Sequence, residues 1–143
     1  MHVSAHLVVP DAAAASEWYA TAFGARERSR IPLPGGKVMT VELELGSSVV
    51  HVASEFPAYG IVGPATLGGT ATVLQLDVAD ADAAWARAIA AGATARHPIA
   101  DQFWGERHGQ LVDPFGHRWN IAHRLREVPH DEIVAAAAKA FGG

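Results

Sequence analysis

The chain repeats its own pattern at an offset of about 69 residues, and this repeat constrains the fold more than any other feature. Residues 6–11 fall on residues 75–80, and both segments are short, mainly apolar stretches that end in an aspartate. An alanine-rich stretch follows each aspartate, and a Gly-Ala pair closes it at Gly24 or at Gly92. A repeat of this kind indicates a repeated structural unit, so we expect two similar halves.

Each half has the pattern of a strand, a helix and then a pair of strands. Asp11 suits a helix N-cap because its carboxylate accepts hydrogen bonds from the free N–H groups of a first turn, and Gly24 suits a left-handed helix end. Alternating residues flank Gly46 and the turn at residues 113–116, which predicts two hairpins. The predicted strands cover residues 3–9, 37–45, 48–54, 71–78, 107–112 and 117–123, and the predicted helices cover residues 12–23, 82–91 and 130–141.

Composition narrows the classes of protein that fit. A chain of 143 residues suits one domain, or two small halves that share a core. The absence of cysteine excludes disulfide scaffolds, thiol catalysis and metal sites with cysteine ligands. A formal net charge of −4 argues against a nucleic-acid partner, and the lack of a long apolar run argues against a membrane partner. Because residues 1–10 show no export signal, we expect a cytoplasmic protein.

Strand alternation predicts that one face of each sheet packs on the helices and that the other face collects polar side chains. This second face holds His6, Glu42, His51, Gln75, Arg107 and Asn120. Two interpretations are open. The face is simply wet, as one side of an antiparallel sheet often is, or two curved halves enclose a cleft that these residues line. From the other six of the eight histidines we expect no chemistry.

Eight segments, in order and at matching spacing, cover nearly the whole chain: residues 7–15, 18–25, 41–46, 54–57, 64–69, 90–93, 101–107 and 113–119. Through these segments the chain resembles the vicinal oxygen chelate superfamily, the group of glyoxalases, bleomycin-resistance proteins and dioxygenases, and within it the PhnB-like branch. The resemblance implies an α+β fold of two βαβββ modules, whose curved mixed sheets enclose a cleft, with a C-terminal helix. A single glyoxalase-like domain over residues 1–143 then comprises module 1 at about 1–56, a linker at about 57–69, module 2 at about 70–124 and the helix at about 130–141.

The metal site of the superfamily's enzymes uses one inward residue from the first and last strand of each module. Carried over strand by strand, those positions fall on Ser4, His51, Val73 and Asn120. Three of these four depart from the usual histidine and glutamate pattern, so the resemblance implies that the metal site is mostly lost. A set displaced by two residues, about 6.5 Å along a strand, has suitable donors for Zn, Mn, Fe or Ni in His6, Glu42 and His51.

The resemblance leaves several activities open, because its members include isomerases, dioxygenases and drug-binding proteins. The first hypothesis is a protein without a cofactor that binds a small, partly aromatic molecule, such as an antibiotic, in the cleft. Its expected ligand-binding residues are His6, Glu42, His51, Gln75, Phe103, Trp104, Arg107 and Asn120. The alternative is a metal-dependent lyase or isomerase in which His6, Glu42 and His51 hold the ion and Glu42 moves the proton as the catalytic residue. A scaffold without a small ligand is the third reading.

Two of the candidate groups also have ordinary structural readings. Arg107 holds an acidic group of a ligand, or forms a bridge to Glu106 or Asp101. Phe103 and Trp104 form an aromatic wall over a ligand, or a small satellite core. The resemblance also implies a homodimer, in which the helix at residues 130–141 packs either on the partner subunit or on its own domain.

Overall fold

The same capping signal starts one long helix in each module. The side chain of Asp11 accepts a hydrogen bond from the backbone N–H of Ala13 at 3.0 Å, and Asp80 accepts one from Ala83 at 3.1 Å. Gly24 ends the first of these helices at a φ of 72°, which only glycine adopts without strain. The computed structural model describes residues 1–142. Its helices are α1 (Ala12–Phe23), α2 (Pro64–Leu67), α3 (Ala81–Ala90) and α4 (His130–Phe141), with a 3₁₀ turn, η1, at Pro57–Tyr59.

The strands form two four-stranded mixed sheets, in the orders β1-β4-β3-β2 and β5-β8-β7-β6. Strand β1 runs parallel to β4 in the first sheet, and β5 runs parallel to β8 in the second. The other neighbouring strands are antiparallel. The strands are β1 (Ala5–Val9), β2 (Arg26–Pro32), β3 (Val38–Leu45), β4 (Ser48–Ser54), β5 (Val73–Asp77), β6 (Thr94–Asp101), β7 (Glu106–Val112) and β8 (Arg118–Arg124). This order confirms the predicted α+β fold of two βαβββ modules with a C-terminal helix.

Two of these strands, β2 and β6, have no counterpart in the sequence-based prediction. Both are the outermost strands of their sheets, and nearly all of their residues are exposed. Strand β2 carries alternating charges instead of alternating apolar residues, and Pro98 interrupts β6. An edge strand with one hydrogen-bonded neighbour needs neither apolar alternation nor every N–H group, so the signal that locates buried strands is missing here.

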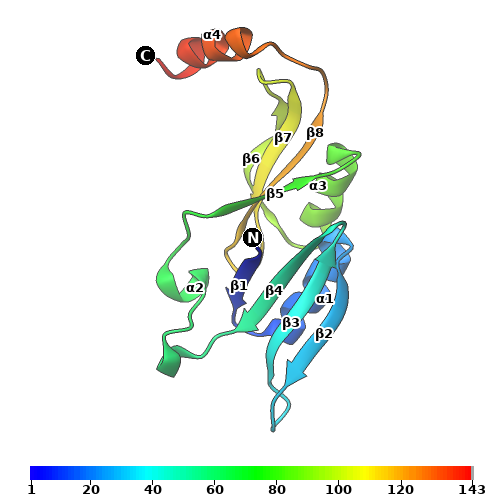
Figure 1. Cartoon of the computed structure of the whole chain (residues 1–143), viewed down its shortest axis with the longest axis vertical. Helices are drawn as coiled ribbons and strands as arrows, with labels where there is room; N and C mark the ends of the chain where they lie inside the picture. Colours follow the sequence, from blue (N-terminus) through cyan, green and yellow to red (C-terminus); the bar gives the residue numbers. More distant parts are fainter. Residues whose placement is uncertain (143) are drawn as a thin grey trace.

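The helices of the two modules lie next to each other, so that one core serves both sheets (Figure 1). The indole N–H of Trp18 on α1 donates to the carbonyl oxygen of Ala91 at 2.8 Å, and the Arg87 guanidinium on α3 donates to the carbonyl of Thr21 at 2.7 Å. Tyr19, Trp119, Leu43 and Leu111 are the largest fully buried side chains. Because the helices occupy the inner side, the opposite face of each sheet stays open.

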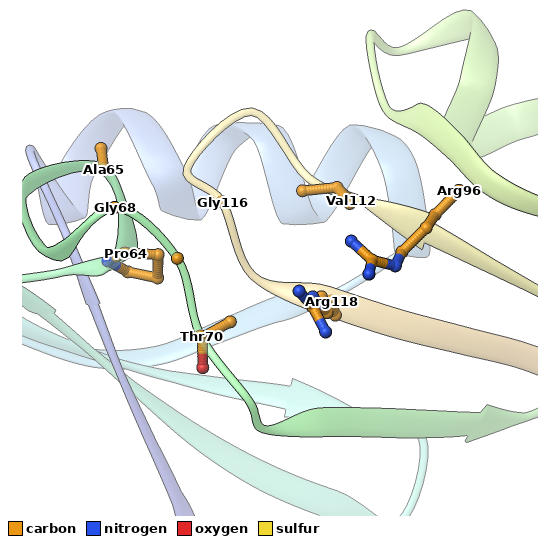
Figure 2. A pocket seen from close by; sticks show the side chains of 9 residues that line it. Pro64, Ala65, Gly68, Thr70, Arg96, Val112, Gly116 and Arg118 are labelled. Atoms are coloured by element: carbon orange, nitrogen blue, oxygen red, sulfur yellow. The ribbon is translucent and has the colours of Figure 1, made fainter.

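The connection between the modules is partly ordered by helical turns. Residues 57–69 contain η1 and α2, where the sequence predicts only an irregular segment. Pro64 lies directly against Gly116 in the turn between β7 and β8 (Figure 2). A Cβ atom at Gly116 would approach Cβ of Pro64 to 2.8 Å, so this contact requires glycine. The connection is thereby held against the second sheet.

Helix α4 extends away from both sheets at one end of the molecule (Figure 1). None of its side chains is buried, and Phe141 is 81% exposed. Its recorded aromatic contact joins the rings of Phe141 and Phe103, whose centroids are 6.4 Å apart. Among the helices that lie within residues 1–142, none combines the length and the apolar character that crossing a membrane requires.

Candidate functional site

A row of polar side chains crosses the open face of the first sheet. The register pairs His6 of β1 with His51 of β4, His51 with Glu42 of β3, and Glu42 with Ser29 of β2. The imidazole rings of His6 and His51 are stacked with their centroids 4.3 Å apart and an interplanar angle of 15°. Nδ1 of His51 lies 3.7 Å from Oε1 of Glu42, and the hydroxyl of Ser29 donates to Oε2 at 3.4 Å. We call these four residues the histidine row.

The second sheet carries an equivalent row of amides. Gln75 of β5 is paired with Asn120 of β8, and Asn120 is paired with Gln110 of β7. The Gln110 amide donates to Oδ1 of Asn120 at 3.0 Å, and the Gln75 amide donates to Oδ1 of Asp77 at the same distance. The open faces therefore bear two matching pairs, His6 with His51 and Gln75 with Asn120, in the positions that the repeat relates.

The register shows which residues of β1 and β5 lie beside His51 and Asn120. Ser4 precedes β1, and Val73 is paired with Arg118 rather than with Asn120. The partners of His51 and Asn120 across these strand pairs are His6 and Gln75. The expected strand began two residues before Ala5, which is why the carried-over set matched Ser4 rather than His6 with His51.

The donors present do not fit a transition-metal ion. The lone pairs of imidazole nitrogens lie in the ring plane, so two nearly parallel stacked rings do not direct them at one point about 2.0–2.1 Å from both. Gln75 and Asn120 offer only neutral amide oxygens, which zinc and its neighbours disfavour. Within the part of the chain that the structure describes, no three His, Asp or Glu side chains are grouped to hold a metal ion. Glu42 and His51 remain a contact pair without a third strong donor.

An apolar hollow of about 360 Å³ adjoins the histidine row on the first sheet. Part of its floor is formed by Thr40 of β3 and Ala53 of β4, which are paired with each other. Each lies two residues along its strand from the pair of Glu42 and His51. The remaining lining residues are Leu33, Met39, Ser54, Phe56, Tyr59 and Ile61. Sequence reasoning missed these residues, although apolar side chains among the Pro and Gly of an irregular segment were a usable signal.

The wall of this hollow is an ordered loop. Reciprocal backbone hydrogen bonds of 2.8 and 3.2 Å join Phe56 to Ile61, and the ammonium group of Lys37 lies 4.3 Å from the centroid of the Phe56 ring. Tyr59, at the tip of this loop, is 83% exposed. An apolar hollow beside a row of hydrogen-bonding groups is the usual composition of a small-molecule site.

Two further hollows lie between the sheets. One of about 610 Å³ lies between the start of β1, the turn from β3 to β4, and β5, and Gln75 is among its lining residues. The other, of about 230 Å³, brings His6 together with Thr70, Thr72, His117 and Arg118. Open space between the sheets agrees with the cleft that the fold implies.

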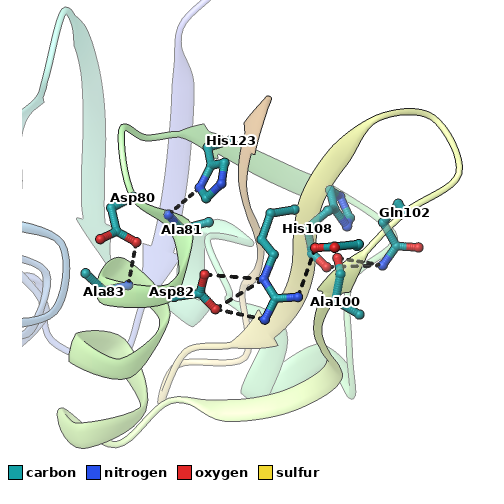
Figure 3. A network of polar contacts seen from close by, with 10 residues as sticks. Asp80, Ala81, Asp82, Ala83, Ala100, Gln102, His108 and His123 are labelled. Carbon is teal, nitrogen blue, oxygen red and sulfur yellow. Dashed lines mark hydrogen bonds and ion pairs between the residues drawn. The ribbon is translucent and has the colours of Figure 1, made fainter. Parts of the chain in front are cut away.

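The prediction that Arg107 shares the open face is wrong. Arg107 is paired with His123, on the helix side of the second sheet, and its guanidinium donates to Asp82 of α3 at 2.9 Å and to Asp101 of β6 at 3.0 Å. Figure 3 shows Asp82 near His123, whose Nδ1 accepts a hydrogen bond from the N–H of Ala81 at 2.8 Å. Hydrogen bonds from Arg107 lower the pKa of the Asp82 carboxyl. The residues that face outward on β7 are its neighbours, including His108 and Gln110.

Phe103 and Trp104 lie at the end of the second sheet rather than beside the histidine row. The Trp104 ring meets the His108 ring edge-on at a centroid distance of 5.3 Å, and its indole N–H donates to Glu106. Phe103 packs on Trp104 at 5.0 Å. Burial lowers the pKa of His108, so this imidazole favours its neutral form. The geometry brings together His6, Glu42 and His51, and separately Gln75 and Asn120, while Phe103 and Trp104 form a third cluster.

Comparison with known proteins agrees with this architecture. An uncharacterized protein of Mycobacterium bovis is 41% identical over 144 residues, which cover 99% of this chain and 95% of that protein. An uncharacterized protein of Mycobacterium tuberculosis has the same identity, with 85% of its length covered.

Solved structures share this fold. TioX from Micromonospora sp. ML1 is 27% identical, with a TM-score of 0.68 over 90% of this chain and 100% of that one. A glyoxalase/bleomycin resistance protein/dioxygenase family enzyme from Burkholderia phytofirmans is 25% identical, with a TM-score of 0.65 over 85% and 97% of the two chains. The family described as the Glyoxalase/Bleomycin resistance protein/Dioxygenase superfamily matches residues 2–121. The chain therefore belongs to this superfamily, as its sequence segments and its two βαβββ modules indicate.

Proposed function

We propose that this protein binds a small, partly aromatic molecule on the open face of the first sheet, at the mouth of the inter-sheet cleft, without a metal ion. The observation that carries the proposal is the apolar hollow directly beside the histidine row. The aromatic part of the ligand packs against Phe56 and Tyr59, and its polar groups bind His51 and Glu42. An antibiotic of this description is one candidate, since bleomycin-resistance proteins are among the groups for which the superfamily is named.

Thermal shift and calorimetric titration with a panel of aromatic natural products test the proposal. A compound that binds only the folded state raises the melting temperature by mass action. We expect Tyr59→Ala and His51→Ala to weaken such binding by about tenfold, the usual effect of losing one good contact. Leu67→Ala is the matched control, because Leu67 is also an exposed apolar residue of the same connection but does not line the hollow.

The alternative is a divalent-metal-dependent lyase or isomerase that uses His6, Glu42 and His51, with Glu42 as the proton carrier. The 3.7 Å contact between Glu42 and His51 is the one observation on its side, and the parallel stacking of the His6 and His51 rings counts against it. Elemental analysis of untagged protein separates the two proposals. Stoichiometric Zn, Mn, Fe or Ni that is lost on chelation, together with a fall in melting temperature, would support the alternative and exclude the metal-free site.

Three finer assignments belong to the same proposal. We assign the chain to the PhnB-like branch on the eight segments given in the sequence analysis, taken in their order and spacing. We also propose a homodimer, which the exposed apolar side chains of α4 support. Residence in the cytoplasm and a role in antibiotic resistance remain predictions.

A further inference from the structure

Two arginines that the sequence analysis assigned no role line one hollow. Arg96 of β6 and Arg118 of β8 line a space of about 420 Å³ between the second sheet and the connection that precedes it. Figure 2 shows their guanidinium groups on one side of this space, and Thr70 and the turn at Gly68 on the other. The remaining lining residues are Pro64, Ala65, Gly69, Val112 and Gly116.

Neither guanidinium has a carboxylate to neutralise it. In residues 1–142, Arg26, Arg28, Arg30 and Arg107 form ion pairs with acidic side chains, and Arg87 donates to backbone carbonyls. In that range the side chains of Arg96 and Arg118 form no ion pair or hydrogen bond, and no Asp or Glu is among the described residues that line their hollow. In a chain with a net charge of −4, two unpaired cations in one concavity are a local excess of positive charge.

The chain holds this concavity in shape. The contact of Pro64 with Gly116 fixes the connection against the turn between β7 and β8. Next to it, a Cβ atom added at Gly68 or Gly69 would meet nothing within 4 Å, so the glycine turn borders open space. The hydroxyl of Thr70 accepts a hydrogen bond from the N–H of Thr72 at 3.1 Å, and its own hydrogen remains available as a donor. The hollow thus presents two guanidinium forks and one hydroxyl donor.

Donors of this kind select oxyanions. A guanidinium binds phosphate or carboxylate oxygens through two parallel hydrogen bonds, and such charge-assisted bonds are stronger than neutral ones. Thr70 and Arg118 also line the smaller hollow that contains His6. A ligand whose acidic group lies between Arg96 and Arg118 therefore has an adjoining space that leads to the histidine row.

We propose that Arg96, Arg118 and Thr70 form an oxyanion subsite, and that the ligand of this protein carries a phosphoryl, phosphonyl or carboxyl group. The subsite itself stands on the arginine geometry, whereas its connection to the ligand rests on the proposed function. The acidic group binds between the two guanidinium groups, and the rest of the molecule extends past Arg118 toward His6.

Calorimetric titration with inorganic phosphate, phenyl phosphate, benzoate and phenol tests the subsite. We expect the two phosphates or benzoate to bind, and Arg96→Gln and Arg118→Gln each to weaken binding by about tenfold, as expected for one charge-assisted contact. Preference for phenyl phosphate over benzoate identifies a phosphoryl group, and the reverse identifies a carboxyl group. Arg124→Gln is the matched control, because Arg124 is an exposed arginine of the same strand outside the hollow.

Three results would overturn the proposal: no oxyanion binding, unchanged affinity in the R96Q/R118Q double variant, or an equal loss in the Arg124→Gln control. Melting temperatures of all variants exclude unfolding as the cause. Arginine-dependent phosphate binding, with no binding of any neutral aromatic compound, would retain the subsite and reject the proposed function. Tyr59-dependent binding of neutral aromatic compounds alone would do the opposite.

Discussion

Tyr19 on α1 donates a hydrogen bond to the buried carboxylate of Asp113, which lies 94 residues further along the chain in the turn between β7 and β8. Asp113 is only 4% exposed and also accepts a hydrogen bond from the indole of Trp119 at 2.9 Å. Its other oxygen accepts from the backbone N–H groups of Phe115 and His117 at 2.9 and 3.0 Å. Four donors thus stabilise one buried charge, and they join the helix of one module to the sheet of the other.

The substitution Asp113→Ala should destabilise the fold by about 3–5 kcal/mol, because it leaves several buried donors without an acceptor. Tyr19→Phe should have a smaller effect of about 1 kcal/mol, since three donors to the carboxylate remain. Urea denaturation followed by circular dichroism measures both. Burial and the charge of Asp113 raise the pKa of Tyr19 well above its ordinary value. In the folded protein its phenol should therefore stay protonated at a pH at which an exposed tyrosine ionises. Equal losses in the two variants would contradict this account.

Much of this fold follows from local sequence signals. The caps at Asp11 and Asp80 locate α1 and α3, and apolar alternation locates β3 and β4, because their buried faces require it. The edge strands β2 and β6 were missed, since exposed edges impose no such pattern. The inter-module contact of Tyr19 with Asp113 has no local signal, because it depends on how two separately specified modules pack.

The sequence predicts site residues correctly only where it predicts which face of its sheet each strand residue occupies. His6, His51 and Glu42 were placed on one face by alternation alone, and the register confirms that placement. Arg107 was assigned to the wrong face because each face of β7 carries both polar and apolar residues. Gly109 has no side chain to indicate which of these faces is buried. Arg96 had no predicted role because its strand was not predicted.

The close packing of Gly109 provides a second test of the fold. A Cβ atom at this position would lie 2.8 Å from Cα of Ile99 and 2.8 Å from Cζ3 of Trp85. Since one of these neighbours is backbone, it does not move aside easily, and Gly109→Ala should destabilise the protein by about 1–3 kcal/mol. Differential scanning calorimetry against Ala95→Gly, a change at an exposed position of the neighbouring strand, measures the effect. A stabilised Gly109→Ala variant would show that α3 does not pack this closely on β7.

His108 should make the protein less stable in mild acid. Burial lowers the pKa of this imidazole in the folded state below its ordinary value of about 6.5. The unfolded chain therefore binds a proton more readily than the folded one, and stability falls as the pH drops through the ordinary histidine range. At higher pH both states are neutral at this residue, and the contribution disappears.

Melting temperatures between pH 7.5 and 5.5 check this sign. His108→Gln should lose less stability over that range than the parent protein, because it removes one group that takes up a proton on unfolding. His2→Gln controls for the loss of a histidine that is fully exposed in the folded chain. A parent protein that loses no more stability than His108→Gln would contradict the direction of the shift.

We predict that removal of residues 129–143 converts the proposed homodimer to a monomer. Helix α4 has 12 residues and no buried side chain, and isolated helices of that length are marginal in water, so a partner surface is the expected source of its stability. Truncation after Val128 retains the segment that packs on Gly105, where a Cβ atom would meet Val128 at 2.8 Å. Multi-angle light scattering of the full and truncated chains measures the mass, and Phe141→Asp should act like the truncation whereas Lys139→Ala should not. A full-length chain that is monomeric at high concentration would contradict the dimer, and an unchanged dimer after truncation would place its interface elsewhere.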